Sequence, residues 1–401
     1  MKGALLELAA RGEEDVFLIG NPEFSYFKSV HKRHTNFSRF ESQLIFQGQP
    51  DFGKKVTCII DKRGDLLTNL MLEIRLPATG NNLVSWINGV GNYIIKQIYF
   101  RIGGEIIAQM NGEYIDTFYK YYLESGHYGN YTSMVKRVSG YQKNSQPGSL
   151  TLYVLLPLWF TKELSQALPL ISLGYHDITL DVEFRPLIDC LYNSNDKSTL
   201  SGFDLHIDYA YLWADYIYLD KWERQMYLER DEINYLIDQV QENIFSIQSA
   251  ETNKNYELVF NMPVKELIWL YRSQYYESIN RWDYYQVYDA STGFDKQPLA
   301  LAGLQFNGLD RSSMRDADYY RLVQPVLHHN SSNNDYIYFY CFANKADALQ
   351  PSGTANFSQI DDARITLQFY SYITAGYVHV WAVNYNFLKI KKGMAGILYS
   401  S

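Results

Sequence analysis

The sequence contains few groups of residues whose types and spacing suit catalysis or metal binding. His328 and His329 are adjacent, but no cysteine or carboxylate stands beside them at ligand spacing, so an ordinary loop is favoured. Asp361 and Asp362 lie in a turn before a predicted strand, where exposed charge is the default. There is no Gly-x-Ser-x-Gly nucleophile motif and no glycine set spaced to cradle a phosphate. We therefore predict no enzyme activity, no metal site and no cofactor.

A basic and aromatic cluster between Phe24 and Phe37 is a better candidate for binding. Its basic residues are Lys28, His31, Lys32, Arg33 and His34. Such a cluster could bind nucleic acid, an anionic membrane or neighbouring proteins, or it could simply be a solvated face. The spacing of the aromatic residues favours a protein contact over a nucleic-acid-binding groove. The formal net charge of −8 opposes a general electrostatic hold on DNA or RNA, so no specific nucleic-acid partner is predicted.

Length and composition indicate a folded chain of two domains. The 401 residues are enough for two domains of roughly 150–200 residues, each with its own core. Aromatic residues make up 16 % of the chain, including 36 tyrosines, which excludes a disordered chain and suits β-structure and large interfaces. The three cysteines, Cys58, Cys190 and Cys341, are too few and too far apart for a disulfide framework. With no signal peptide and no long apolar run, the sequence predicts a soluble protein made in the cytosol.

The elements that position these residues are predominantly β-strands. After the turn at Pro351–Thr354, Ile365, Leu367 and Phe369 alternate with polar residues, the period of a half-buried strand. Residues 377–388 are dense in β-branched and aromatic side chains, as expected for a sandwich core.

The same pair of patterns occurs earlier in the chain, at residues 178–185 and 203–213. Ile178-Thr179-Leu180 is echoed by residues 365–367, and Leu205-His206-Ile207 by residues 378–380, in the same order at the ends of two halves of similar length. This arrangement suggests a duplicated β-module.

The further predicted elements are short strands with few helices. Strands are expected at residues 38–47, 54–61, 66–76, 94–102, 105–110, 150–156, 256–262, 265–273, 301–306 and 336–343. Helices are expected at 111–125 and 161–168, and one or two more at about 220–240, beginning with Asp220 and Glu223 as a capping box. Polar loops are expected at 140–149, 193–202, 274–298 and 326–335. The pattern predicts an all-β protein of two antiparallel β-sandwiches with short inserted helices.

Nine blocks of the sequence carry more information than its pattern of elements. The first is LIGNPEFSYFKSVHKRHTNF, from Leu18 to Phe37. The others are RGDL from Arg63, WINGVGNYII from Trp86, IGG from Ile102, ALPLISL from Ala167, YLDKWER from Tyr218, PSGTANFSQI from Pro351, NYN from Asn384 and GMAG from Gly393. In sequence and in order, these blocks closely resemble the double jelly-roll major capsid proteins of large eukaryotic (nucleocytoplasmic) DNA viruses. They extend over nearly the whole chain, which stands at the short end of the family, so its surface loops are expected to be small.

The resemblance implies two consecutive eight-stranded antiparallel jelly rolls and a structural role without enzyme activity. It places an amino-terminal arm at residues 1–22, the first jelly roll at 23–216, and the second at 217–401, beginning with the linker helices at about 220–240. Three subunits would form a pseudo-hexagonal homotrimer that tiles an icosahedral shell. The implied partners are further copies of the chain, neighbouring capsomers, minor capsid proteins and the inner membrane side of the virion, with assembly in the host cytoplasm.

Three rival functions remain at this stage. The nearest is a minor capsid or vertex paralogue with the same fold. A glycan-binding jelly-roll module is supported by the aromatic loops alone. A metal enzyme of the cupin type is disfavoured, because His206 and His379 are expected to be single outward-pointing histidines without a His-x-His motif.

Two segments are predicted to contact other subunits or the shell. The first is the amino-terminal arm, through Phe24, Tyr26, Phe27, His31 and Arg33, and the second is the tyrosine-rich loop Tyr275–Tyr288, through Tyr275, Tyr276, Tyr284 and Tyr285. Four Asn-x-Ser/Thr sequons occur, at Asn36, Asn130, Asn330 and Asn356. Asn330 is the candidate glycan carrier because it lies in a polar loop, whereas Asn36 and Asn356 are expected to have structural roles such as Asx turns.

Overall fold

The computed structural model describes residues 2–81, 84–138, 149–193, 197–331 and 335–399. The chain divides into two compact units, Met1–Asn36 and Phe37–Ser401, which are called here the arm and the body. The predicted exposed loop at 140–149 lies almost entirely outside the described residues.

Within residues 2–36, the arm contains two short helices and otherwise no regular structure. The helices are α1 (Lys2–Ala9) and α2 (Val16–Ile19). None of residues 2–36 is buried, although many of them are apolar.

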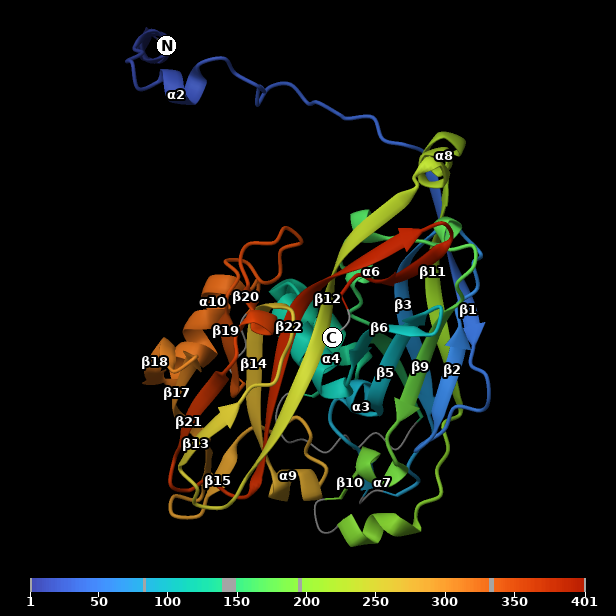
Figure 1. The fold of residues 1–401 in the computed structure, drawn as a ribbon, viewed down its shortest axis with the longest axis vertical. Helices are drawn as coiled ribbons and strands as arrows, with labels where there is room; N and C mark the ends of the chain where they lie inside the picture. The colour runs from blue at the N-terminus through green and yellow to red at the C-terminus, as the bar shows by residue number, and fades with distance from the viewer. Residues whose placement is uncertain (1, 82–83, 139–148, 194–196, 332–334, 400–401) are drawn as a thin grey trace. The chain divides into compact units, whose positions relative to one another are not determined.

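The body contains two β-sandwiches (Figure 1). Each is built on two sheets with four main strands; short strands add to one sheet of each sandwich, β8 in the first and β20 and β23 in the second. In the first sandwich one sheet has the order β1-β11-β3-β7 and the other has the order β2-β9-β5-β6, all antiparallel. These strands are β1 (Phe37–Ile45), β2 (Lys55–Ile59), β3 (Leu66–Leu76), β5 (Ile95–Ile102), β6 (Glu105–Met110), β7 (Leu150–Leu155), β9 (Ile178–Phe184) and β11 (Tyr209–Leu219).

The second sandwich repeats this arrangement. Its sheets have the orders β12-β22-β14-β19 and β13-β21-β17-β18. The strands are β12 (Glu232–Ile247), β13 (Asn253–Glu257), β14 (Pro263–Ser273), β17 (Leu299–Phe306), β18 (Leu309–Asp316), β19 (Ile337–Cys341), β21 (Ala363–Phe369) and β22 (Gly376–Lys391). In each sandwich the first, eighth, third and sixth strands form one sheet, and the second, seventh, fourth and fifth form the other. This is jelly-roll connectivity, so the predicted fold class, two consecutive eight-stranded jelly rolls, is confirmed.

The predicted duplication also has a structural counterpart. The echoed residues 178–180 and 365–367 lie in β9 and β21, which occupy the same position in their sheets. The second echo is less regular, because residues 205–207 precede β11 whereas residues 378–380 lie within β22.

Short elements complete the body. The other α-helices are α3 (Val90–Tyr93), α4 (Gly112–Tyr122), α5 (Tyr128–Met134), α6 (Trp159–Lys162), α7 (Leu187–Cys190), α8 (Lys221–Glu229), α9 (Gln274–Ser278) and α10 (Gln324–His328). A π-helical turn, η5 (Tyr319–Val323), precedes α10. Turns of 3₁₀ helix lie at Ser125–His127, Leu164–Gln166, Leu170–Ser172, Lys197–Gly202 and Phe357–Gln359. The other strands are β4 (Val84–Trp86), β8 (Leu168–Pro169), β10 (Leu191–Asn193), β15 (Val287–Asp289), β16 (Phe294–Lys296), β20 (Ala355–Asn356) and β23 (Met394–Ile397).

The predicted linker helices at about 220–240 are only partly correct. Asp220 caps α8 as expected, but the helix ends at Glu229 and Glu232 begins the long strand β12. Ile233 and Ile237 are spaced for a helix, but Tyr235 between them is also buried, which gives the period of a strand. Pairing with β22 along all 16 residues of β12 decides the conformation.

Other boundaries also differ from the sequence prediction. Residues 203–208 are not part of a strand, because β11 begins at Tyr209. The polar strand β18 was missed, since its exposed side chains lack an apolar alternation. The predicted loops at 274–298 and 326–335 contain α9, β15, β16 and the end of α10.

Helix α4 lies between the two sandwiches and is buried on nearly every side (Figure 1). Asn111 caps it by accepting a hydrogen bond from the Tyr114 N–H at 2.8 Å. Tyr114 contacts Trp381 of β22, and Tyr121 contacts Phe339 of β19. One hydrophobic core therefore continues from the first sandwich through α4 to the second.

Candidate assembly surfaces and a buried polar cluster

The arm exposes a large amount of apolar surface. The exposed fractions of Phe24, Tyr26 and Phe27 are 65 %, 90 % and 99 %, and His31 and Arg33 are also exposed. Further exposed apolar residues of the arm are Leu5, Leu6, Leu8, Val16, Phe17, Leu18, Ile19 and Val30. Exposed apolar groups at this density are typical of a segment that docks on another surface.

The tyrosine-rich segment Tyr275–Tyr288 is mainly a junction within the subunit. Tyr276 and Tyr285 are buried, and the Tyr285 hydroxyl lies 3.0 Å from that of Tyr93 in the first sandwich. The indole N–H of Trp282 donates to the Asp189 carbonyl at 2.9 Å. The prediction of intersubunit contact therefore does not fit Tyr276 and Tyr285, because their side chains are already packed inside the chain.

The remaining tyrosines of this segment reach the surface to different degrees. Tyr275 and Tyr288 are 60 % and 51 % exposed, whereas Tyr284 is half-buried and donates a hydrogen bond to Asp295. Tyr275 and Tyr288 also line a cavity of about 510 Å³ with Arg281. The contact of Tyr275 and Tyr284 with another subunit stays a prediction.

Buried charges cross the junction between the sandwiches. Glu113 of α4 pairs with Arg185 of the first sandwich and lies 3.3 Å from Arg272 Nη1 of β14. Burial raises the pKa of Glu113, but the two guanidinium groups outweigh this effect and hold the pKa at about 2. Lys120 of α4 similarly bridges Asp116 and Asp335, with N–O distances of 3.1 and 2.6 Å.

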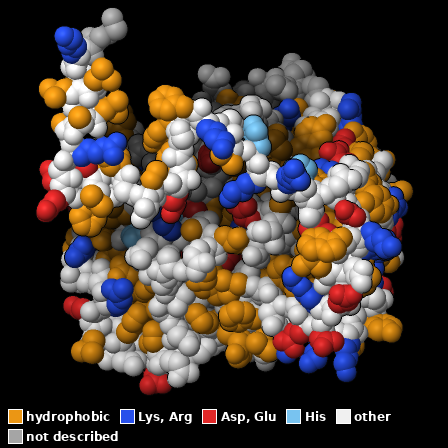
Figure 2. Space-filling view, turned by 90° about the horizontal axis from the view of Figure 1, so that it is seen from above, with side chains coloured by type: hydrophobic (Ala, Val, Ile, Leu, Met, Phe, Trp, Pro, Cys, Tyr) orange, Lys and Arg blue, Asp and Glu red, His pale blue; other side chains and the backbone are white. Residues whose placement is uncertain are grey.

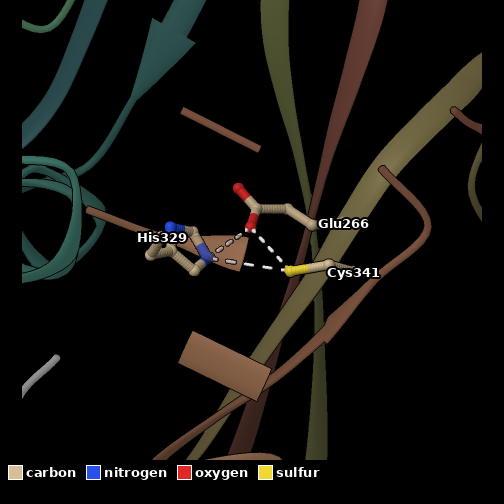
Figure 3. A group of neighbouring side chains, drawn as sticks. All are labelled: Glu266, His329 and Cys341. Carbon is tan, nitrogen blue, oxygen red and sulfur yellow. Dashed lines mark hydrogen bonds and ion pairs between the residues drawn. The ribbon is translucent and has the colours of Figure 1, made fainter. Parts of the chain in front are cut away.

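A separate cluster of three chemically distinct side chains lies where a sheet of the second sandwich packs against α4. Glu266 of β14 and Cys341 of β19 are direct partners across the antiparallel pair, and His329 follows α10. His329 Nε2 lies 3.0 Å from Glu266 Oε2, and Cys341 Sγ lies 3.7 Å from each of those atoms. Figure 3 shows the three side chains pointing toward one another, and all three residues are buried.

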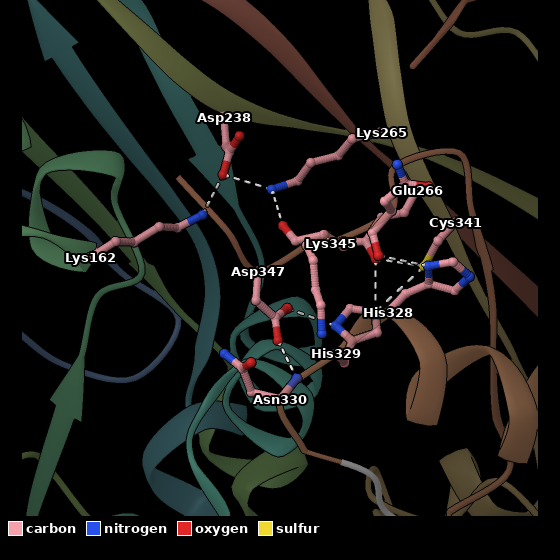
Figure 4. A network of polar contacts seen from close by, with 12 residues as sticks. Lys162, Asp238, Lys265, Glu266, His328, His329, Asn330, Cys341, Lys345 and Asp347 are labelled. Atoms are coloured by element: carbon pink, nitrogen blue, oxygen red, sulfur yellow. Dashed lines mark hydrogen bonds and ion pairs between the residues drawn. The ribbon is translucent and has the colours of Figure 1, made fainter. Parts of the chain in front are cut away.

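The backbone and the neighbouring residues hold this cluster in place. The His329 N–H donates to the Pro325 carbonyl at 2.9 Å, and the Cys341 N–H donates to Gln324 Oε1 at 2.9 Å. On its other side, His329 Nδ1 lies 2.8 Å from Asp347 Oδ1 (Figure 4). Burial by itself would lower the pKa of His329, but the carboxylates of Glu266 and Asp347 raise it well above its usual value.

The cluster overturns two expectations from the sequence. His329 lies in a loop after α10 as expected, but it is buried, and a cysteine and two carboxylates contact it although none is near in sequence. His379 is likewise buried, with Nδ1 2.9 Å from Glu242 Oε1, rather than outward-pointing. His206 lies in a loop beside Asp51 instead of on a strand.

A second buried network and a cavity lie next to the cluster (Figure 4). Asp238 of β12 pairs with Lys162 of α6 and with Lys265 of β14, whose Nζ is 3.0 Å away. A cavity of about 620 Å³ borders Lys162, Asp238 and Asp347 at the junction of the sandwiches.

The sequons have different environments. Asn330 is exposed at the rim of the cavity, so its glycosylation stays a prediction. Asn356 Oδ1 accepts a hydrogen bond from the Ser358 N–H at 3.1 Å, which is the expected Asx turn.

Hydrophobic side chains are exposed at many places on the face seen in Figure 2, among charged side chains of both signs. On the body, Leu322, Val323, Val326 and Leu327 of η5 and α10 are 40–68 % exposed. None of the described helices is long and apolar enough to cross a membrane.

Two family models cover most of the chain. The model for the major capsid protein N-terminus matches residues 25–220, and the model for the large eukaryotic DNA virus major capsid protein matches residues 223–396. The chain is also 35 % identical to the major capsid protein of Pyramimonas orientalis virus over 430 residues, with all of both chains covered. This chain belongs to the major capsid protein family of large eukaryotic DNA viruses.

Further relatives and solved structures agree with the family. The major capsid protein of Paramecium bursaria Chlorella virus 1 is 29 % identical over the full length of both chains. The capsid structure of that virus matches with a TM-score of 0.82 and 27 % identity, covering 94 % of this chain and all of the other. The Faustovirus major capsid protein shares the fold, with a TM-score of 0.78 at 12 % identity. As a member of this family, the chain is a structural protein of the virion capsid.

Proposed function

We propose that three copies of this major capsid protein form a pseudo-hexagonal capsomer that tiles an icosahedral shell. The observation that carries the proposal is the repeated strand order of the two sandwiches in one continuous body. Two similar sandwiches per chain give a trimer six nearly equivalent corners, so a single chain type can fill a hexagonal lattice. The charged links through Glu113 and Lys120 support a fixed relation between the sandwiches within each subunit.

The arm is proposed to dock on neighbouring capsomers, minor capsid proteins or the membrane side of the virion. Its exposed aromatic and aliphatic residues support such a contact, and Arg33 and its basic neighbours suit an acidic rim. The proposal includes assembly in the host cytoplasm, no enzyme activity and no specific nucleic-acid partner.

The mass of the purified protein under native conditions tests the capsomer. Native mass spectrometry or light scattering is expected to give three times the 46.7 kDa mass of the chain. Negative-stain images of the trimer should then show a hexagonal outline. A strict monomer at high protein concentration would contradict the proposal.

Abundance in purified virions separates a major subunit from a minor or vertex paralogue. Quantitative mass spectrometry is expected to find this chain as the most abundant shell protein. A few copies per particle would instead assign it to the vertices or to a minor shell position.

A further inference from the structure

We propose that Glu266, His329 and Cys341 form a structural zinc site in the second jelly roll. Together they supply one carboxylate oxygen, one imidazole nitrogen and one sulfur, which are the donor types that Zn²⁺ uses in proteins. A soft thiolate beside an imidazole favours zinc over magnesium or calcium, which take oxygen ligands.

The distances among the three donor atoms fit one metal ion. The edges of the triangle are 3.0, 3.7 and 3.7 Å. Ligands on a tetrahedral zinc ion with ordinary bond lengths lie about 3.4–3.6 Å apart. Bond lengths of about 2.0 Å to nitrogen and oxygen and about 2.3 Å to sulfur place an ion just out of the plane of this triangle, as a tetrahedral ion with a fourth ligand requires.

Two features around the triangle are independent of these distances. Glu266 Oε1 is buried and has no hydrogen-bond partner within the described part of the chain, so it is available as a further ligand atom or as an acceptor for a metal-bound water. Asp347 lies 2.8 Å from His329 Nδ1, where a carboxylate orients the imidazole of a metal ligand and leaves Nε2 to bind the ion.

The site would link elements that are distant in sequence. Glu266 and Cys341 are opposite each other on β14 and β19, and His329 ends α10, so the ion would connect the helix to the sheet. We infer a stabilising role, without any reaction.

Metal analysis of the purified full-length protein tests the site. After equilibration with zinc sulfate and removal of free metal, the wild-type chain is expected to retain about one zinc ion. Cys341→Ser and His329→Gln should lose it, whereas Cys190→Ser, a change of another buried cysteine, should retain it. Asp347→Asn should still bind zinc at saturation, but with an affinity about 10–100-fold weaker.

If the ligand variants do not fold, cobalt substitution of the wild-type protein still tests the site. The wild-type protein with Co²⁺ is expected to show the thiolate-to-cobalt absorption band of a cysteine-ligated ion, and Cys190→Ser should show the same band. Folded wild-type protein without retained zinc and without this band would overturn the site, and the three residues would then be a hydrogen-bonded ion pair with a thiol neighbour.

Discussion

The carboxylate of Glu113, at the junction of the two sandwiches, illustrates how a buried charge is stabilised in this subunit. Glu113 faces two guanidinium groups, one from each sandwich, so it stays ionised although it is buried. Removing one member of such a group leaves the other charges buried and unpaired, which costs far more than breaking a surface ion pair.

We expect Glu113→Gln to lower the free energy of unfolding by on the order of 3 kcal/mol at neutral pH. The matched control is Glu232→Gln, because Glu232 also pairs with two cations, Lys389 and Lys391, but near the surface. Its effect in urea unfolding at the same protein concentration should be much smaller. Equal effects of the two substitutions would contradict a special role for the buried junction.

The low pKa of Glu113 also predicts that the junction between the two sandwiches loses stability in acid. Its pKa of about 2 in the folded chain is below the ordinary value of 4.5, so its ionised form stabilises the fold. This contribution is complete above pH 4.5 and is lost as the pH falls toward 2. Urea unfolding between pH 6 and pH 3 should therefore show a steeper loss of stability for the wild type than for Glu113→Gln. Parallel pH profiles would contradict this assignment.

Substitution of Tyr285 tests whether this residue stabilises the fold of one subunit or takes part in a contact between subunits. Tyr285→Phe removes the hydroxyl that lies 3.0 Å from the Tyr93 hydroxyl and should cost about 1 kcal/mol of unfolding free energy. Tyr288→Phe, at an exposed neighbour, should cost little. Native mass spectrometry should give the same oligomer for both variants. If Tyr285→Phe instead formed more monomer than the wild type while the stability of the subunit was unchanged, Tyr285 would belong to the intersubunit contact.

Among the elements, α4 contacts both sandwiches and is buried along nearly its whole length. It contributes rings to the shared core and both Glu113 and Lys120 to the charged junction. Its close packing depends on glycine at its first position. A Cβ atom at Gly112 would lie 2.2 Å from the Asn92 carbonyl oxygen and 2.6 Å from that of Ile95.

Gly112→Ala should therefore displace α4 from the backbone of residues 92–95. We expect a loss of unfolding free energy of about 1–3 kcal/mol or more, because overpacking against a backbone is relieved only by moving the helix. Gly129→Ala in α5 is the matched control, since a Cβ atom there meets nothing within 4 Å. Thermal unfolding should show a lower midpoint for the first variant and an unchanged or higher one for the second. Equal unfolding midpoints of the two variants would mean that α4 accommodates the added methyl group without a loss of stability.

For the whole molecule, the arm and the body differ in burial. The body has a large hydrophobic core, whereas none of the described arm residues is buried. The proposed role of the arm in assembly can therefore be tested separately from the folding of the body.

Replacing Phe24, Tyr26 and Phe27 together by serine should leave the thermal unfolding midpoint unchanged but reduce assembly beyond the capsomer. Sedimentation of the assembled material and its images would measure this loss. Tyr175→Ser is the control, because Tyr175 is 82 % exposed on the body. Normal assembly of the triple variant would exclude the aromatic residues of the arm from the shell contacts.

Local patterns and matching blocks were enough to predict the strands with strong apolar alternation and the family. The folded chain was needed to show that Ile233 and Ile237 lie in a strand, since the long pairing of β12 with β22 outweighs local spacing. It was also needed to show that Tyr285 is buried and that Glu266, His329 and Cys341 meet. Those residues are brought together by antiparallel pairing and the position of α10, and such non-local contacts leave no periodic signal in a single chain.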